Sequence, residues 1–255
     1  ENSPWKWRIW ALMKSQKKGQ GDYLLVLTDL ERRIVLDILP DRKKETLISW
    51  LQSPPAGIDL THLSFAATDL WKHYREAVQS AFPEVAVVAD RFHVVQNLHK
   101  AIHEARRKAQ ELAKTEDERK KLKGLRYLLL KNRQNLTEKN KKRLDKLAES
   151  HPDLYRLWEL RQELHDWYEV RTIPEFAQIT LVQWIENARQ LKMDALDTFC
   201  NTLENWQPEI LNFFEHRITS GFVEGMNSKI RVLKRIAFGI PNNDHFRLRV
   251  LGFCG

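Results

Sequence analysis

The sequence predicts an α/β fold whose mixed sheet is interrupted by a long, all-helical segment. Short apolar runs with strand character alternate with helical patterns as far as Asp90. From His93 to about Trp206, apolar residues recur at helical spacing and no convincing strand is seen. The chain has 255 residues, of which 42% are hydrophobic, so it can bury a core as one large domain or two small ones.

The sheet region opens with a predicted hairpin. Tyr23–Thr28 and Ile34–Leu39 are runs of aliphatic residues typical of strands, and Leu30–Arg33 between them reads as a turn. A helix is predicted over Lys44–Gln52, and the Pro54–Gly57 segment ends it.

A strand, a helix and another strand follow. Leu63–Thr68 is a predicted strand that leads directly into Asp69. A helix is predicted over Trp71–Phe82, and the next strand, Val85–Ala89, leads into Asp90. Strands that alternate with helices in this way indicate a mixed α/β sheet.

The middle of the chain is predicted to be helical throughout. Lys114–Glu149 is rich in Lys, Arg and Glu with spaced leucines, and Phe176–Phe199 continues the helical pattern after Pro174. A stripe that indicates packing between helices consists of Leu157, Leu160, Leu164, Trp167 and Tyr168. We therefore predict an irregular segment over 1–16, the first part of the core over 17–107, a helical insertion over 108–206 and C-terminal core helices over 207–255.

Composition restricts the function classes. The formal net charge of +8 favours an anionic partner, most simply nucleic acid, although a basic balance is a weak signal by itself. The two cysteines, Cys200 and Cys254, form neither a zinc-type spacing nor a disulfide framework, so a reducing cytosol is expected. No run of about 18 apolar residues occurs, so no membrane span is expected.

The segment Phe222–Arg235 predicts a helix with two different faces. One face carries the apolar residues Val223, Met226, Ile230 and Leu233. The other carries Glu224, Asn227, Ser228, Arg231, Lys234 and Arg235. One carboxylate followed by a row of cations suits a divalent metal held beside a phosphate backbone. The alternative is a solvated amphipathic helix with ordinary charge pairing.

Asp69 and Asp90 are the strongest acidic candidates, because each follows a predicted strand. Ligand sites in open α/β sheets favour that edge, and Glu224 completes a trio of carboxylates if its helix packs back on the sheet. Three carboxylates can hold two Mg²⁺ ions for phosphoryl transfer. The alternative for either aspartate is a helix cap or a turn. His99 and His103 have metal-compatible spacing, but without a glutamate in the zinc-protease position we treat it as chance.

Four motifs occur in the order found in the ISL-three group of bacterial insertion-sequence transposases. They are Lys18–Tyr23, Thr68–Tyr74, Asp90–Val94 and Thr219–Arg235. From about Lys17 to Gly255 the chain resembles the DDE catalytic domain of that family. The resemblance implies an RNase H-like fold interrupted by an all-helical insertion.

The resemblance also implies site residues. Asp69 is expected as the second catalytic acid and Glu224 as the third, both as metal ligands. Asp90 and His93 match a family motif with two alternative roles, which are to support the site or to position a helix. Positions expected to face DNA are Arg217, Asn227, Lys229 and Arg235, and Arg231 and Lys234 belong to the same basic face.

By the same resemblance, the activity is DNA strand cleavage and strand transfer in transposition. Two Mg²⁺ ions are expected in an intact site, with Mn²⁺ as a substitute. The expected partners are DNA, as transposon ends and target, and further copies of the chain on that DNA; no membrane is expected. The expected location is the bacterial cytoplasm at the nucleoid. The N-terminal DNA-binding region with zinc-ligating cysteines, which family members carry, is not seen in this chain.

The family's first catalytic aspartate has no counterpart here. After Glu1, no acidic residue occurs before Asp22. Ile9–Gln16 can be encoded by ATT TGG GCA TTG ATG AAA TCG CAA, and skipping two bases gives Leu-Gly-Ile-Asp-Glu-Ile-Ala, the family's segment. We therefore hypothesise that residues 1–16 are translated out of frame; the alternative is a genuine, divergent N-terminus. A non-catalytic DNA-binding relic or regulator is the second functional hypothesis.

Overall fold

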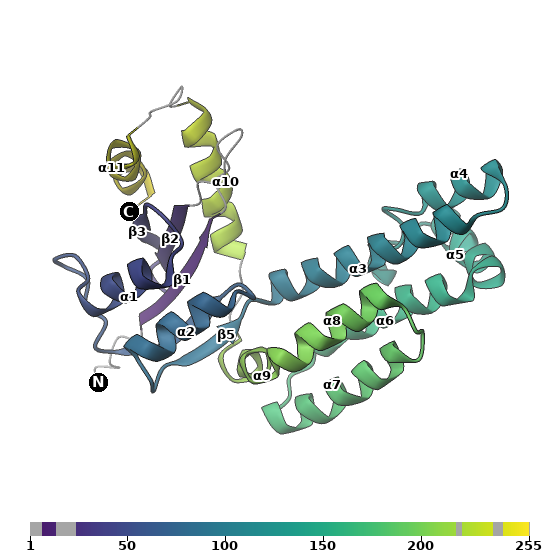
Figure 1. The fold of residues 1–255 in the computed structure, drawn as a ribbon, viewed down its shortest axis with the longest axis horizontal. Helices are drawn as coiled ribbons and strands as arrows, with labels where there is room; N and C mark the ends of the chain where they lie inside the picture. The colour runs from purple at the N-terminus through teal and green to yellow at the C-terminus, as the bar shows by residue number, and fades with distance from the viewer. Residues whose placement is uncertain (1–6, 14–23, 218–220, 237–241, 255) are drawn as a thin grey trace. The chain divides into compact units, whose positions relative to one another are not determined.

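The computed structural model describes residues 7–13, 24–217, 221–236 and 242–254, and it divides the chain into two compact units (Figure 1). The first unit consists of Glu1–Asp90 and His216–Gly255, and the second consists of Arg91–Glu215. In the described part of the chain, no helix combines the length and apolar character that crossing a bilayer requires.

The first unit is built on a five-stranded mixed sheet of order β3-β2-β1-β4-β5. The two antiparallel pairs are β1 with β2 and β2 with β3, and the two parallel pairs are β1 with β4 and β4 with β5. Strands β1, β3, β4 and β5 therefore run in one direction and end at one edge, here called the carboxyl edge. The strands are β1 Trp7–Met13, β2 Leu24–Asp29, β3 Ile34–Leu39, β4 Leu63–Thr68 and β5 Ala86–Ala89.

The central strand β1 corrects the prediction of an irregular segment over residues 1–16, which is wrong for residues 7–13. The run Trp7–Met13 is almost continuously apolar, with Arg8 as its one charged residue. Such a run suits a strand covered on both faces, where no alternation between apolar and polar residues is expected. Without β1, strands β2 and β4 would each present an unpaired edge in the middle of the sheet. Residues 1–6 and 14–16 lie outside the described part.

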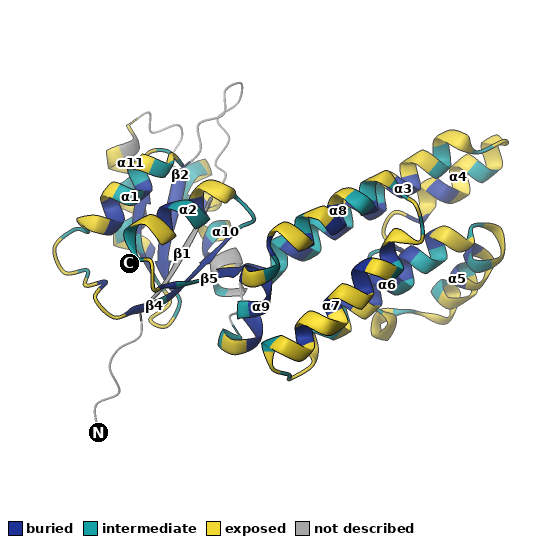
Figure 2. Ribbon diagram, turned by 60° about the horizontal axis from the view of Figure 1, so that its bottom comes forward, coloured by how far each residue is buried: buried dark blue, intermediate teal, exposed yellow. Residues whose placement is uncertain are grey.

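Helices cover both faces of the sheet, and Figure 2 shows the buried strands in dark blue. The alternating residues of β2 explain the two layers. Leu25 and Leu27 belong to a core cluster with helices α1 (Lys44–Gln52) and α2 (Lys72–Ala81). Leu24 and Val26 belong to a second cluster with α10 (Gly221–Ile236) and α11 (Asn243–Cys254). The predicted helices over 44–52, 71–82 and 222–235 are thus confirmed to within one residue at each end.

The apolar stripe predicted on α10 faces the sheet. Met226 and Ile230 are 5% and 0% exposed, and Leu233 packs against the same cluster. The side chain of Val223 lies outside the described part. Since α10 is held to the sheet by this stripe, its polar residues are left for the opposite side.

The second unit is helical throughout its described residues, as predicted. The predicted stripe forms core, because Leu157, Leu160, Leu164 and Tyr168 are at most 1% exposed. Trp167 is half-buried, and its Nε1 donates to the carbonyl of Ala177 and to the hydroxyl of Thr180. The elements are α3 Arg91–Leu112, α4 Glu116–Gly124, η1 Arg133–Asn135, α5 Glu138–Ser150, α6 Pro152–Glu169, α7 Pro174–Arg189, α8 Asp194–Asn205 and α9 Gln207–His216.

The boundaries between the units differ from those read off the sequence. The structure divides the chain after Asp90 and before His216, rather than after residue 107 and before residue 207. The reason is that α3 is one unbroken helix of 22 residues whose buried face is apolar from Val94 to Ala105. Nothing in its periodicity marks a change of unit at residue 107.

Candidate active site

The structure brings Asp69 and Asp90 to neighbouring strand ends at the carboxyl edge. Asp69 follows β4 and Asp90 follows β5, and these parallel strands pair as far as Thr68 opposite Ala89. The backbone N–H of Asp90 donates to the carbonyl of Thr68 at 2.9 Å. The expectation that strand ends place these two aspartates together therefore agrees with the sheet topology.

Asp69 is half-buried beside the buried phenol of Tyr74 on α2. Burial raises the pKa of Tyr74, and the negative charge of Asp69 raises it further. Tyr74 is therefore neutral across the physiological pH range and keeps its hydroxyl proton. A neutral phenol next to a carboxylate can donate a hydrogen bond at this edge.

Arg42 adds a positive charge that the sequence analysis missed. Its guanidinium lies 4.0 Å from the ring centroid of Trp71, and that ring packs edge-on against Tyr74 at 4.9 Å. Arg42 comes shortly after β3, whose end lies at the carboxyl edge because β3 runs in the same direction as β4. The hairpin prediction alone does not give this direction relative to β4.

The positions of Asp90 and of the histidines of α3 are more typical of residues that stabilise the fold than of metal ligands. Asp90 is 5% exposed and directly precedes α3, a position typical of a capping carboxylate. His93 lies in the first turn of α3, which belongs to the second unit. His99 accepts a hydrogen bond at Nε2 from Arg161 Nε at 3.3 Å, and burial lowers its pKa to about 4. With that nitrogen engaged, the spacing of His99 and His103 gives no metal site.

Glu224 lies in the first turn of α10, and its side chain is outside the described part. The short connection before α10 limits the distance between the start of this helix and His216, which contacts the sheet. His216 stacks on Phe65 of β4 with ring centroids 4.6 Å apart, and Gly221 follows five residues later. Five residues of extended chain span at most about 17 Å, so α10 begins within that distance of the backbone of His216.

Asn227 lies one turn after Glu224 and is half-buried. Its Oδ1 is buried and accepts no hydrogen bond from the described residues. A buried amide oxygen without a donor is costly, and a bound cation would satisfy it. Carboxylate and amide oxygens are the ligands that Mg²⁺ prefers, so this donor chemistry fits the expected ion. Among the side chains that the structure describes, no group of three His, Cys, Asp or Glu is positioned to hold a metal.

The basic face predicted on α10 points to solvent. Lys229, Arg231 and Arg235 are exposed, and Lys234 is half-buried. Arg217 is half-buried just before α10, with a backbone φ of 48° in the left-handed region. The exposed cations are therefore available to a polyanion, as the sequence pattern indicates.

The strand register shows which residues of β1 lie near the end of β4. Strands β1 and β4 pair in parallel with Trp10 opposite Ala67 and Ala11 opposite Thr68. Leu12 is the next residue of β1, and Asp69 is the next residue after β4. No acidic residue occupies residues 7–13 of β1.

Two buried carboxylates of the sheet have structural partners and are not candidates for this site. Asp29 accepts hydrogen bonds from the N–H groups of Glu31 at 2.8 Å and Arg32 at 3.0 Å, which closes the β2–β3 turn. Asp37 accepts from Trp50 Nε1 at 2.8 Å and pairs with Arg247. Both carboxylates are thus satisfied within the fold.

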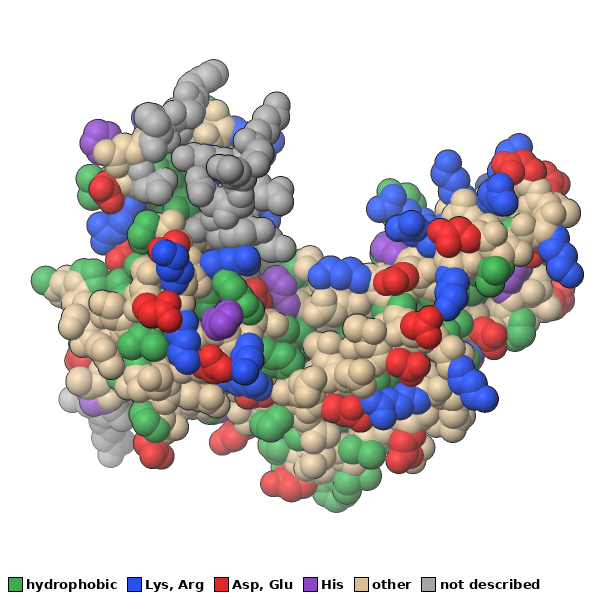
Figure 3. Space-filling model, in the orientation of Figure 1, with side chains coloured by type: hydrophobic (Ala, Val, Ile, Leu, Met, Phe, Trp, Pro, Cys, Tyr) green, Lys and Arg blue, Asp and Glu red, His purple; other side chains and the backbone are tan. Residues whose placement is uncertain are grey.

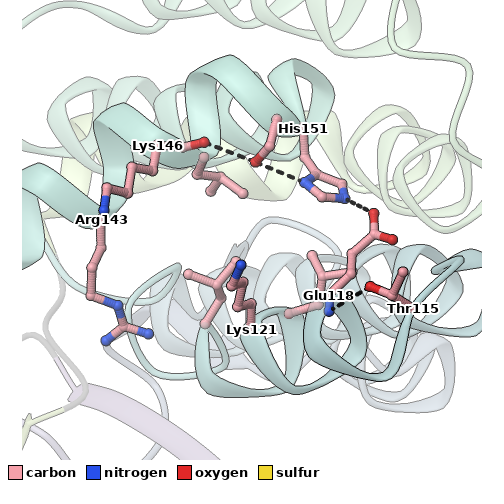
Figure 4. A pocket seen from close by; sticks show the side chains of 10 residues that line it. Thr115, Glu118, Lys121, Arg143, Lys146 and His151 are labelled. Atoms are coloured by element: carbon pink, nitrogen blue, oxygen red, sulfur yellow. Dashed lines mark hydrogen bonds and ion pairs between the residues drawn. The ribbon is translucent and has the colours of Figure 1, made fainter.

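The Lys-rich helices of the second unit form a separate basic surface. Figure 3 shows Lys and Arg side chains gathered over α4 and α5, among acidic ones. A cavity of about 580 Å³ lies between these helices, with Lys121, Arg143 and Lys146 among its lining residues. His151 and Glu118 form an ion pair across it at 3.3 Å (Figure 4). The net positive lining suits phosphate groups better than acid–base chemistry.

Comparison with known proteins identifies the family. The model of the ISL3 (ISL-three) DDE transposase family, described as "Transposase", matches residues 14–250. The transposase for insertion sequence element IS1001 of Bordetella parapertussis is 32% identical over 231 residues, covering 89% of this chain and 56% of that protein. The transposase for insertion sequence element IS1557 of Mycobacterium tuberculosis H37Rv is 29% identical over 246 residues, covering 87% and 54%.

The chain therefore spans about half the length of these curated relatives. No solved structure matches it. The family match extends across both units and includes the strand that leads into Asp69 and the helix that carries Glu224. The chain belongs to the ISL3 family of DDE transposases.

Proposed function

We propose that this chain is the DDE catalytic domain of a transposase, with an RNase H-like sheet. Its reaction would be hydrolysis of a phosphodiester at a transposon end, followed by attack of the freed 3′-hydroxyl on target DNA. The observation that carries the proposal is the strand order β3-β2-β1-β4-β5 with Asp69 at the end of β4, next to the central strand. The resemblance described under the sequence analysis implies this place for the second catalytic acid.

The residues at the carboxyl edge would have different roles in metal binding, hydrogen bonding and charge stabilisation. Asp69 and Glu224 would hold Mg²⁺, with the amide oxygen of Asn227 as an additional donor. When bound, Mg²⁺ supplies positive charge at the scissile phosphate. Tyr74 keeps its proton, so its hydroxyl would be available as a hydrogen-bond donor at this edge. Arg42 provides a fixed positive charge beside it.

DNA binding would use the exposed cations of α10 and the basic surface over α4 and α5. Contacts of this kind neutralise phosphates and release counterions, so binding weakens as salt rises. The proposed partners are transposon ends and target DNA, and the proposed assembly is a homo-oligomer on that DNA in the bacterial cytoplasm.

We further propose that this chain is impaired because Leu12 stands where the first acid belongs. In the shifted reading frame, the Asp codon GAT takes one base from codon 12 and two from codon 13, so the acid would lie at the end of β1. The family match begins at residue 14 and leaves out residues 1–13, which supports an out-of-frame origin for these thirteen residues. Codons that cannot give Asp in the shifted frame would contradict that origin.

The direct test is restoration of the acid. On DNA that carries the ends of the parent element, we expect the native chain to be nearly inactive with Mg²⁺. Leu12→Asp should raise the rate of strand cleavage by about 10³-fold or more, since groups that act as a unit are strongly non-additive. Leu12→Asn is the control of similar size without charge, and Asp69→Asn in the Leu12→Asp chain should abolish the gain. Full activity of the native chain would contradict the impairment.

The second candidate is a non-catalytic DNA-binding relic or regulator. The absence of an acid from β1 favours it. It predicts that both the native chain and Leu12→Asp bind transposon ends, but that neither cleaves them at any Mg²⁺ or Mn²⁺ concentration. Parallel binding and cleavage measurements on the two chains separate the candidates.

A further inference from the structure

The cavity between α4 and α5 has an apolar floor. Its volume is about 580 Å³, within the range of about 300 to 1,000 Å³ that is usual for small-molecule sites. The floor consists of Leu122, Leu125 and Leu147, which are 1%, 7% and 3% exposed. Because these side chains belong to the core of the second unit, the fold holds the floor in place.

Three cations line the cavity, and none of them forms an ion pair with another residue in the described ranges. Lys121 of α4 and Lys146 of α5 are exposed, whereas Arg143 is half-buried. Arg143 donates from Nη2 to the carbonyl of Gly124 at 2.9 Å, and this bond holds its guanidinium at one end of the cavity (Figure 4). A neutral carbonyl does not balance the charge of Arg143, so this end suits an anionic group such as a phosphate.

The opposite end of the cavity presents a carboxylate that is held at both oxygens. Glu118 Oε1 lies 3.3 Å from His151 Nε2, and Glu118 Oε2 accepts from the backbone N–H of Lys114 at 2.9 Å. The His151 ring is held in turn by Ser150, whose Oγ lies 3.0 Å from Nδ1. Each carboxylate oxygen can accept more than one hydrogen bond, so Glu118 is still an acceptor for an amino group at this end.

One class of ligand matches all three parts of the cavity. A nucleotide combines a flat ring face, a ring edge with hydrogen-bonding groups and a phosphate. The ring face fits the leucine floor, the phosphate fits the end at Arg143, and an amino group on the ring edge fits Glu118. A phosphate alone would leave the floor without a contact, and an apolar ligand would leave the cations unbalanced. In a duplex, stacking and pairing cover the bases, so only an unpaired nucleotide fits.

We propose that the cavity between α4 and α5 binds one unpaired nucleotide, with its base on the leucine floor and its phosphate at Arg143. The site selects a base with an amino group, such as cytosine, over thymine, which has none. The nucleotide comes from DNA that contains an unpaired base or from free nucleotides, and separate measurements distinguish these sources. Where DNA is the source, the inference rests on the proposed function.

Free nucleotides test the site through the methyl resonances of its three leucines. In NMR titrations of the whole chain, dCMP should shift these resonances with a dissociation constant on the order of 1 mM, and dTMP should bind about 10-fold more weakly. Glu118→Gln should remove the difference between the two nucleotides. Glu149→Gln, at an exposed residue of α5 that does not line the cavity, is the matched control and should keep it.

Three duplexes test DNA as the source. One is fully paired, one carries a single bulged cytosine, and one carries a bulged abasic nucleotide at the same position. Fluorescence anisotropy should show about 10-fold tighter binding of the cytosine bulge than of the other two, because the contacts of one base contribute on this scale. Lys121→Gln combined with Lys146→Gln should remove the preference. Lys142→Gln, an exposed cation of α5 that does not line the cavity, should keep it.

The outcomes separate the possible ligands. Binding of dCMP with equal affinity for the three duplexes supports the site and assigns it to free nucleotides. Absence of dCMP binding overturns the proposal, as does inorganic phosphate that shifts the leucine resonances as dCMP does. A peptide of Glu–Leu repeats that shifts them at lower concentration than dCMP also overturns it. All these measurements are made without Mg²⁺, so a failure of strand cleavage does not change them, and a negative result leaves the proposed cleavage in place.

Discussion

Asp37 of β3 and Arg247 of α11 lie 210 positions apart in the chain and form a two-point ion pair. Arg247 donates from Nη2 to Asp37 Oδ2 at 3.0 Å and from Nε to Oδ1. Asp37 is 2% exposed and also accepts from Trp50 Nε1 at 2.8 Å. The hydrogen bond to Asp37 raises the pKa of Arg247. One carboxylate thus ties α1 and α11, helices on opposite faces, to an edge strand of the sheet.

Asp37→Ala should lower the free energy of unfolding by about 3 kcal/mol, because it removes one partner of a buried ion pair and leaves the indole N–H of Trp50 without an acceptor. Urea denaturation followed by Trp fluorescence measures this. Arg249→Ala, an exposed residue on the same helix, should change stability by less than about 0.5 kcal/mol. Equal effects of the two substitutions would contradict the role of Asp37.

Ile230→Ala should destabilise the first unit by about 3 kcal/mol, since Ile230 is fully buried where α10 packs on the sheet. Because the second unit is a separate compact body, its unfolding transition should stay in place. Hydrogen exchange resolved by segment distinguishes the two transitions. Val232→Ala, at a residue 46% exposed on the same helix, is the control and should be nearly neutral.

The stability of the second unit should fall on acidification because of His99. Burial lowers the pKa of His99 to about 4 in the folded chain, below its ordinary value of 6.5. The unfolded chain then binds more protons between these two values, so stability is lost as pH falls from about 6.5 to 4. His99→Gln should flatten this part of the profile measured by thermal unfolding. His62→Gln, at an exposed residue of the first unit, is the matched control.

Removal of α10 cations should reduce the salt dependence of DNA binding. Each phosphate contact contributes about 0.9 to the slope of log K against log salt, so Arg231→Gln and Arg235→Gln together should lower the slope by about 1.8. Fluorescence anisotropy with a duplex at several salt concentrations measures it. Lys192→Gln, an exposed cation between α7 and α8, should not change the slope. A loss of affinity with an unchanged slope would place these arginines away from phosphate.

The strands and helices of the sheet region could be predicted because their local signals agree with the fold. Leu63–Thr68 was predicted with its observed bounds, since an aliphatic run that stops at Asp69 has few alternatives. The stripe of Met226 and Ile230 likewise predicted which face of α10 is buried. The structure of such segments is determined mainly by residues close to them in the sequence, so it can be predicted from local patterns.

The missed features depend on tertiary structure. Trp7–Met13 lacks the alternation of apolar and polar residues that marks a half-buried strand, and its place between β2 and β4 is set by tertiary pairing. Arg42 reaches Trp71 only because β3 runs in the direction of β4. The pair Asp37–Arg247 joins segments on either side of the helical insertion, and no period or motif links them.

The helical insertion between β5 and α10 also sets the order in which the first unit forms on the ribosome. Leu24, Val26 and Val35 are covered by α10 and α11, which are synthesised only after the whole of Arg91–Glu215. We expect this sheet face to stay open to solvent throughout that interval, as a site for chaperones or for aggregation. Closing the long loop costs little extra entropy, because the cost grows only with the logarithm of its length. The time needed to translate the insertion therefore delays the covering of this sheet face by α10 and α11 more than the entropy of loop closure does.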